Sequence, residues 1–211
     1  MKVVSFNVGP AIAVNWKGET VITGIYKRPV EGKHKIAFAT IEGDEQADLT
    51  VHGGADKAVY AYDTSHYRYW KNILQRADWN YGLFGENLTT EGLYDEQVKV
   101  GNIYQIGSTK LMALQPRFPC FKLNIRFNLS TMAKLFAQQK RNGIYFRVIE
   151  EGYIQVNDTI QLVQESQHTV TIQDFVESYY TRGSDKALLA RILAIEFLPS
   201  RMRQQFEGFA E

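Results

Sequence analysis

Short runs of β-branched and aromatic residues, separated by glycine-containing turns, dominate the chain from Lys2 to about Gln164. Such runs, with few helical patterns between them, are typical of an antiparallel or mixed sheet that closes into a barrel or sandwich. We therefore predict a mainly β, α+β domain with a barrel-like sheet over residues 1–164. The runs are KVVSFNV, ETVITGIY, KIAFATI, AVYAY, QVKVGNIYQIG, KLMALQ, YFRVIEEGYI and DTIQLV.

Two helical patterns interrupt this β-rich region. Residues 63–77 begin with Asp63, Thr64 and Ser65, any of which is a suitable N-cap. Residues 129–143 form the second pattern, with Ser130 as the expected cap. A glycine at its end, Gly143, is a C-terminal stop signal.

The pattern changes after about Glu165, where three helical stretches follow one another: TIQDFVESYYTRG, SDKALLARILAIEFL and PSRMRQQFEGF. Thr171 and Asp174 form a capping-box pattern, and Pro199 is expected to end the second helix. None of these helices is long enough to be stable alone. We predict a small three-helix C-terminal domain, residues 165–211, that packs on the β domain or across a homodimer.

Charge and cysteine content limit the kinds of partner and compartment. The chain has 24 Lys and Arg against 23 Asp and Glu, so its net charge of +1 gives no reason to expect binding to nucleic acid or to a membrane surface. The sequence shows neither a signal-peptide pattern nor a run of about 18 apolar residues. A single cysteine fits a reducing compartment. We expect a cytoplasmic protein.

The single cysteine, Cys120, lies in the stretch QPRFPCFKL. Pro116 and Pro119 each bias the preceding residue toward extended backbone, which predicts a constrained loop at a sheet rim. Arg117 and Lys122 would favour the thiolate, the form that attacks electrophiles or binds a soft metal. The alternative is a buried cysteine that acts as a small hydrophobic core residue.

Two further stretches place polar residues at glycine turns, residues 43–62 (GDEQADLTVHGGADKAVYAY) and residues 81–92 (YGLFGENLTTEG). Glycine turns let backbone N–H groups approach a ligand and often form anion sites. Two ordinary turns are the alternative interpretation. The candidate residues are His52, Gly53, Gly54, Gly85, Glu86 and Asn87.

Several common site motifs do not occur in the sequence. The four histidines lack metal-site spacing, and one cysteine cannot complete a standard structural zinc site. A Ser-His-Asp triad stays open as an alternative, although no G-x-S-x-G motif supports it. Without a Walker loop or G-x-G-x-x-G, nucleotide binding by those routes is disfavoured.

Five blocks, in this order, resemble the MOSC domain family (molybdenum cofactor sulfurase C-terminal domain), in particular its stand-alone YiiM-like members. The blocks are TGIYKRPV, GDEQADLTVHGGADKAVYAY, GLFGENLTTEGL, QPRFPCFKL and GIYFRVIEEGYI. The helical tail is similar to the three-helix domain that those members carry. The resemblance implies a barrel-like domain that binds the molybdenum cofactor, in which a pterin that ends in a phosphate holds the metal. Pyridoxal phosphate binding is not expected.

The resemblance also implies roles for individual residues. Cys120 is implied to be the thiolate ligand of molybdenum, Asn87 to help hold the cofactor, and Arg117 to pair with its phosphate or an oxo ligand. A proton donor is expected at His52 or Glu86. The further candidates for the cofactor-binding wall are His52, Gly53, Gly54, Lys57 and Gly85.

The implied activity is the reduction of N-hydroxylated compounds, such as hydroxylaminopurine-type base analogues and hydroxylamines, to amines. Nothing in the sequence resembles a flavin, haem or iron–sulfur site, so we expect the electrons to come from a separate flavoprotein-type reductase. The alternative function is a non-catalytic carrier of the cofactor or of a persulfide on Cys120. A generic β-barrel protein that binds small molecules is a third interpretation.

Overall fold

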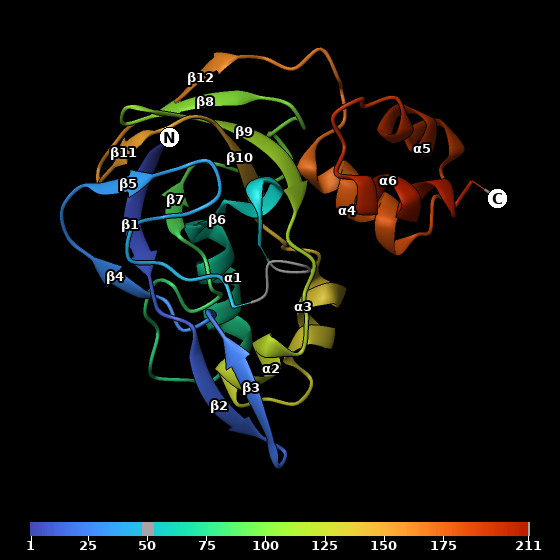
Figure 1. The fold of residues 1–211 in the computed structure, drawn as a ribbon. Helices are drawn as coiled ribbons and strands as arrows, with labels where there is room; N and C mark the ends of the chain where they lie inside the picture. The colour runs from blue at the N-terminus through green and yellow to red at the C-terminus, as the bar shows by residue number, and fades with distance from the viewer. Residues whose placement is uncertain (48–52, 211) are drawn as a thin grey trace.

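The structure is a computed structural model that describes residues 1–47 and 53–210. A curved eight-stranded sheet forms its centre (Figure 1). The strands are β1 (Lys2–Val8), β4 (Arg28–Val30), β6 (Val59–Asp63), β7 (Leu88–Glu91), β8 (Ile103–Ile106), β9 (Thr109–Pro116), β10 (Ile144–Glu150) and β12 (Ile160–Gln164). Their order is β12-β8-β9-β10-β6-β7-β1-β4, in which β6 and β7 are parallel and the other neighbours antiparallel.

The sheet curls so that β1 meets the turn that precedes β12. Val3 donates its N–H to the carbonyl of Asp158 (2.9 Å), and Ile160 donates to the carbonyl of Met1 (2.9 Å). A single bridge between Lys2 and Thr159 joins the two strands there, so the sheet is barrel-like without a closed ladder in the described part of the chain. The prediction of a mainly β, α+β fold is confirmed.

Two two-stranded sheets accompany the large one. β2 (Ile12–Trp16) pairs with β3 (Glu19–Thr23), and this hairpin extends away from the body of the molecule (Figure 1). Lys17 and Gly18 form its tip, both with positive φ, as a tight two-residue turn requires. β5 (His34–Ile36) pairs with β11 (Gly152–Ile154).

Three helices lie between the strands in the chain: α1 (Thr64–Ile73), α2 (Lys122–Phe127) and α3 (Met132–Gln139). α2 and α3 lie below the sheet in Figure 1. Asp63 caps α1 by accepting the Ser65 N–H, so the predicted helix and cap are confirmed. α3 is shorter than predicted, because Lys140 adopts a left-handed conformation that ends the helix before Gly143. Thr131, and not the predicted Ser130, occupies its N-cap position. The sequence interpretation missed α2.

The chain ends in α4 (Ile172–Tyr180), α5 (Lys186–Leu193) and α6 (Ser200–Glu207), as predicted. The Thr171–Asp174 capping box is present at α4. Pro199 does not end α5, which stops at Leu193; it stands at the N-cap of α6 instead. Among the described residues, no helix has the length and apolar character needed to cross a membrane.

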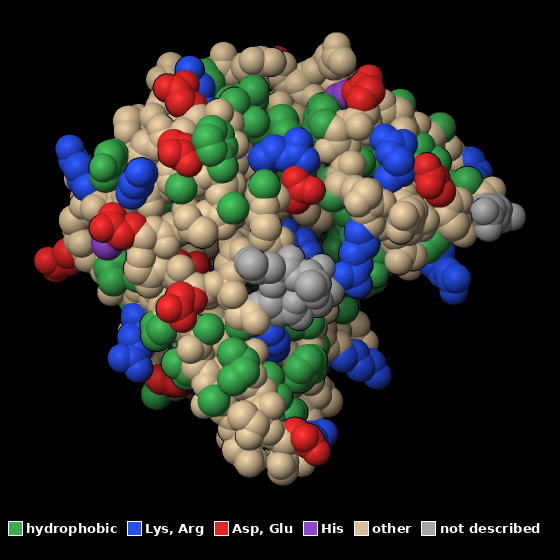
Figure 2. Space-filling model, in the orientation of Figure 1, with side chains coloured by type: hydrophobic (Ala, Val, Ile, Leu, Met, Phe, Trp, Pro, Cys, Tyr) green, Lys and Arg blue, Asp and Glu red, His purple; other side chains and the backbone are tan. Residues whose placement is uncertain are grey.

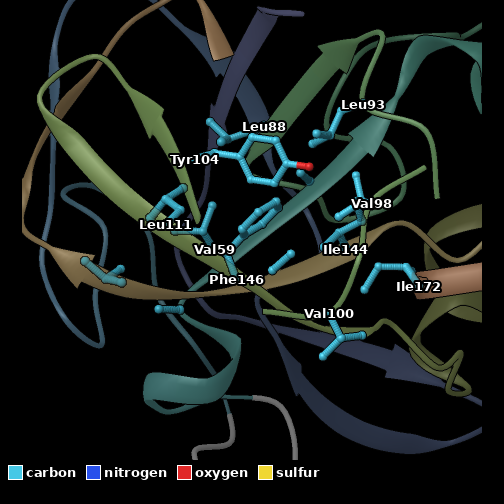
Figure 3. Packing of buried hydrophobic residues seen from close by; sticks show 14 of the residues in the cluster. Val59, Leu88, Leu93, Val98, Val100, Tyr104, Leu111, Ile144, Phe146 and Ile172 are labelled. Atoms are coloured by element: carbon cyan, nitrogen blue, oxygen red, sulfur yellow. The ribbon is translucent and has the colours of Figure 1, made fainter. Parts of the chain in front are cut away.

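One hydrophobic cluster joins the sheet to these C-terminal helices. Val59, Leu111 and Phe146 point into the space inside the curved sheet, and Ile172 of α4 extends this packing beyond it (Figure 3). The N–H of Ile172 also donates to the carbonyl of Val98 (2.9 Å). The C-terminal helices therefore pack directly on the sheet, while the domain boundary at residue 164 stays a prediction.

Candidate functional site

A pocket at the rim of the sheet brings together several of the predicted site residues. Its volume is about 90 Å³. Five predicted residues line it: Lys57, Gly85, Asn87, Arg117 and Cys120. The sequence interpretation therefore identified residues that come from distant segments and meet at one place.

Cys120 lies in the loop of residues 117–120, which we call the cysteine loop, between β9 and α2. The thiol-bearing residue is half-buried and lines the pocket, so it is not a core residue. Its carbonyl accepts the N–H of Leu123 (3.0 Å), which fixes the first turn of α2. At the other end of the loop, Asn142 donates its side-chain N–H to the carbonyl of Arg117 (2.8 Å). Both ends of the cysteine loop are thus held.

Arg117 is a buried cation with an unused hydrogen-bond donor. Only 6% of the residue is exposed, and its guanidinium lies over the rings of Tyr60 (5.7 Å) and Phe136 (5.2 Å). Burial lowers the pKa of Arg117, but Tyr60, Tyr145 and Cys120 raise it by more, so the pKa is raised overall. Its Nη1 has no hydrogen-bond partner among the described residues. A buried unpaired donor of this kind is costly, and an anionic ligand in the pocket would satisfy it.

A second part of the lining, Lys27, Asp44 and Asn87, forms a buried network. The Lys27 ammonium pairs with the Asp44 carboxylate. Asn87 donates its amide N–H to Asp44 Oδ2 (3.0 Å) and accepts the backbone N–H of Tyr60 (3.1 Å) with its amide oxygen. Asn87 therefore holds Asp44 in position, and its predicted contact with a cofactor stays a prediction.

Glu86 lies behind the pocket rather than among the described residues that line it. It is fully buried and accepts hydrogen bonds from Gly82 N–H (2.7 Å), Phe84 N–H (3.1 Å), the Thr89 hydroxyl (2.9 Å) and the Tyr67 hydroxyl. Burial raises the pKa of its carboxyl group, although these hydrogen bonds act in the opposite direction. The carboxylate organises the turn that leads into β7. Its predicted role as a proton donor stays a prediction.

Two glycines make this turn possible. Gly82 and Gly85 have φ angles of 83° and 82°, which side-chain-bearing residues rarely adopt. A Cβ atom at Gly85 would also come within 2.9 Å of Ile25. Gly85 can therefore form the pocket wall because it has no side chain.

The Gly53–Gly54 turn lies next to the pocket without lining it in the described part of the chain. Gly54 donates its N–H to the side-chain oxygen of Gln46 (3.0 Å), and Gln46 does line the pocket. Lys57 lines it from the end of a short 3-10 helix, η1 (Ala55–Lys57). His52, predicted as a wall residue and proton donor, lies outside the described residues.

Positive charge predominates among the described residues of the lining. The cationic side chains are those of Lys27, Lys57, Arg117 and Lys122, and the acidic ones those of Asp44 and Glu45. Because Lys27 and Asp44 neutralise each other, a net positive charge remains, which favours an anionic ligand. Lys and Arg side chains gather near the centre of this face of the molecule (Figure 2). Among the described residues, no group of three or more His, Cys, Asp or Glu could hold a metal ion.

Comparisons with known proteins agree with this fold. Residues 48–161 match the model of the MOSC domain. The chain is 34% identical over 204 residues to the Bacillus subtilis protein named "Uncharacterized protein YflK", covering 97% of this chain and 92% of that protein. It is 36% identical over 154 residues to Protein YiiM of Escherichia coli, covering 72% of this chain and 68% of that protein. The chain therefore belongs to the MOSC domain family.

A solved structure and a fungal relative extend the comparison. The crystal structure of YiiM from Geobacillus stearothermophilus superposes with a TM-score of 0.82 at 29% identity, covering 100% of this chain and 99% of that one. A Gibberella moniliformis protein named "Reductase" is 36% identical over 150 residues, which are 70% of this chain and 27% of that protein. The chain thus resembles YiiM proteins over its whole length and a named reductase over part of that protein.

Proposed function

We propose that the pocket binds the molybdenum cofactor and that the protein reduces N-hydroxylated compounds to amines. MOSC domains are associated with this cofactor, and the fungal relative is named a reductase. The observation that carries the proposal is the pairing, in one pocket, of a half-buried thiol at Cys120 with the unpartnered guanidinium nitrogen of Arg117.

The residues present fit the chemistry of this cofactor. The Cys120 thiolate would bind molybdenum, because thiolates are soft ligands. Arg117 would bind the pterin phosphate or an oxo group through its fixed donors, and Lys57 and Lys122 would add positive charge.

Bound there, the cofactor would supply the two-electron chemistry that removes oxygen from the substrate. The chain itself contributes an anchoring thiol at Cys120, a cation at Arg117 that stays charged, and a buried wall that limits water. The electrons would come from a separate flavoprotein-type reductase. Hydroxylaminopurine-type bases and hydroxylamines are the proposed substrates, and detoxification of such bases is the proposed purpose.

A turnover experiment tests this function. The protein would be purified from a host that makes the cofactor, its molybdenum and pterin measured, and amine formation from hydroxylaminopurine followed with a reduced viologen as electron donor. We expect amine formation in proportion to bound molybdenum, and none from the Cys120→Ser variant. A protein that holds the cofactor without turning over would contradict the enzymatic proposal and favour a cofactor carrier.

A further inference from the structure

We propose that Lys27, held by Asp44, is the proton donor of this reaction. The inference rests on the function proposed above. Converting an N-hydroxylated compound to its amine takes two electrons and two protons, breaks the N–O bond and releases water. A reduced flavoprotein supplies the electrons, Lys27 delivers one proton to the departing oxygen, and solvent supplies the proton that nitrogen gains. Such a step requires an acid on the pocket lining.

The position of Lys27 meets this requirement. The residue lies in the extended segment between β3 and β4, and its side chain is only 8% exposed. It lines the same pocket as Cys120 and Arg117, and so does its partner Asp44. The ammonium group is therefore a buried acid on the lining of the pocket in which the substrate would react.

Asp44 fixes the ammonium in place through contacts on both carboxylate oxygens. Its Oδ1 accepts the N–H of Gly9 (3.0 Å) and pairs with Lys27, while Oδ2 accepts the Asn87 amide (3.0 Å). The backbones of Gly82 and Lys27 also pack closely, since a Cβ at Gly82 would come within 2.8 Å of the Lys27 carbonyl oxygen. Proton transfer depends on such a fixed geometry.

The electrostatic surroundings make Lys27 a stronger acid than an ordinary lysine. Burial lowers its pKa from 10.5, and this effect exceeds the opposing effects of Asp44 and Glu86. A proton donor is most effective when its pKa lies near the working pH. The direction of the shift therefore suits the proposed role.

The other titratable groups of the pocket are less suitable donors. Burial raises the pKa of Tyr60 and of Tyr145, and the Tyr60 hydroxyl already donates to the carbonyl of Asn142 (2.8 Å). Lys57 and Lys122 are only half-buried. Lys27 is thus the buried, fixed acid among the described residues of the lining.

The first test replaces Lys27 with arginine, which keeps the charge and the ion pair but does not release a proton in proteins. We expect Lys27→Arg to bind molybdenum within about twofold of wild type, while amine formation per bound molybdenum falls about 100-fold, as the loss of a general acid predicts. The wild-type rate should decline as pH rises through the lowered Lys27 pKa, below 10.5, and the variant should lack this decline. The matched control is Lys110→Arg, because Lys110 forms an exposed pair with Glu150 (2.7 Å) and does not line the pocket.

A second test needs neither cofactor nor turnover. The protein would be prepared without cofactor and with isotope-labelled lysines, and the Lys27 NMR signal would be identified as the one that Lys27→Arg lacks. This signal should report a pKa below 10.5. Asp44→Asn should lower that pKa further, because Asp44 raises it. A Lys27 that titrates at or above 10.5 would overturn the assignment.

The two tests separate the failure of this assignment from the failure of the proposed function. Wild-type turnover with an equally active Lys27→Arg variant would refute only the role of Lys27. A wild-type protein that binds the cofactor and reduces no substrate would refute both.

Discussion

The two sides of the pocket are held in different ways. The cysteine loop presents Cys120 and Arg117, is anchored through its backbone, and leaves a guanidinium nitrogen unpaired. On the other side, Lys27, Asp44 and Asn87 are held by side-chain contacts that use nearly all of their polar atoms. The unpaired donor lies where we propose that a ligand binds, whereas the satisfied network holds its side chains in fixed positions. The two sides should therefore respond differently to mutation.

The largest expected effect is on the cysteine loop, at Cys120→Ser. Because changes to groups that merely orient a metal ligand cost about 10- to 100-fold in affinity, losing the ligand itself should cost at least about 100-fold. Stability should change little, since the residue is half-buried. Molybdenum retained after gel filtration and the midpoint of urea unfolding measure the two effects. If Cys120→Ser lost molybdenum binding and stability to a similar extent, Cys120 would be a structural residue.

The next largest effect is expected at Arg117, where a substitution should change cofactor binding much more than stability. Arg117→Met should weaken cofactor binding about 10- to 100-fold, because a hydrogen bond to a charged group contributes about 1.5–3 kcal/mol. The free energy of unfolding should change by no more than about 1 kcal/mol, since an apolar side chain replaces a buried charge that has an unpaired donor. Arg141→Met is the control, because Arg141 also lies over an aromatic ring, Tyr69 (4.0 Å). Unchanged binding in Arg117→Met would contradict the proposed anion contact.

The opposite pattern is expected for Glu86, behind the pocket. Glu86→Gln should reduce the free energy of unfolding by about 1–3 kcal/mol, because an amide N–H would meet backbone N–H donors that now bind a carboxylate. Glu91→Gln, at an exposed pair with Lys2, should change it by less than about 1 kcal/mol. Chemical denaturation measures both. Equal effects would show that the buried hydrogen bonds of Glu86 contribute little.

The raised pKa of Glu86 predicts that the stability of the protein depends on pH. The folded pKa of Glu86 is raised above 4.5, so the folded protein binds this proton more readily than the unfolded chain does. Its contribution to stability is fully present below pH 4.5 and is lost as pH rises through the folded pKa. Wild type should therefore gain stability relative to Glu86→Gln as the pH falls from neutral toward 4.5, which denaturation at several pH values would show.

The smallest effect is expected where the C-terminal helices support the cysteine loop. The rings of Phe118 in the loop and Tyr179 in α4 have centroids 3.9 Å apart. Tyr179→Ala should lower the free energy of unfolding by about 1 kcal/mol and increase the rate of cofactor loss less than about tenfold. Tyr179→Phe keeps the ring and should resemble wild type in both measurements. If Tyr179→Ala retained the cofactor as wild type does, the loop would not depend on this contact.

The difference between the two sides also explains what the sequence could predict. The cysteine loop is a local feature, because Pro116, Pro119 and Cys120 lie together in the sequence and their backbone preferences act over one or two residues. The Lys27–Asp44 pair joins residues 17 positions apart. Asp44 lies in the glycine-turn stretch that was a candidate, but nothing in the sequence pairs it with Lys27. Only the folded chain shows that both are buried.

The remaining differences have similar physical causes. α2 was missed because its six residues, which begin at Lys122, give too short a pattern to recognise. Glu86 was predicted as a possible acid from its glycine turn, but the hydrogen bonds that enclose it come from Tyr67 and Thr89 as well as from that turn. The eight predicted runs overlap nine of the described strands, because short runs of β-branched and aromatic residues indicate buried strands. β2, β4 and β7 lie outside those runs and were missed.

X-ray absorption at the molybdenum edge tests the central claim, that Cys120 ligates the metal of a bound cofactor. The measurement would compare cofactor-loaded wild type with the Cys120→Ser variant loaded to whatever extent it binds. We expect the wild-type spectrum to require one sulfur ligand more than that of the variant. Identical sulfur coordination in the two proteins would contradict the account.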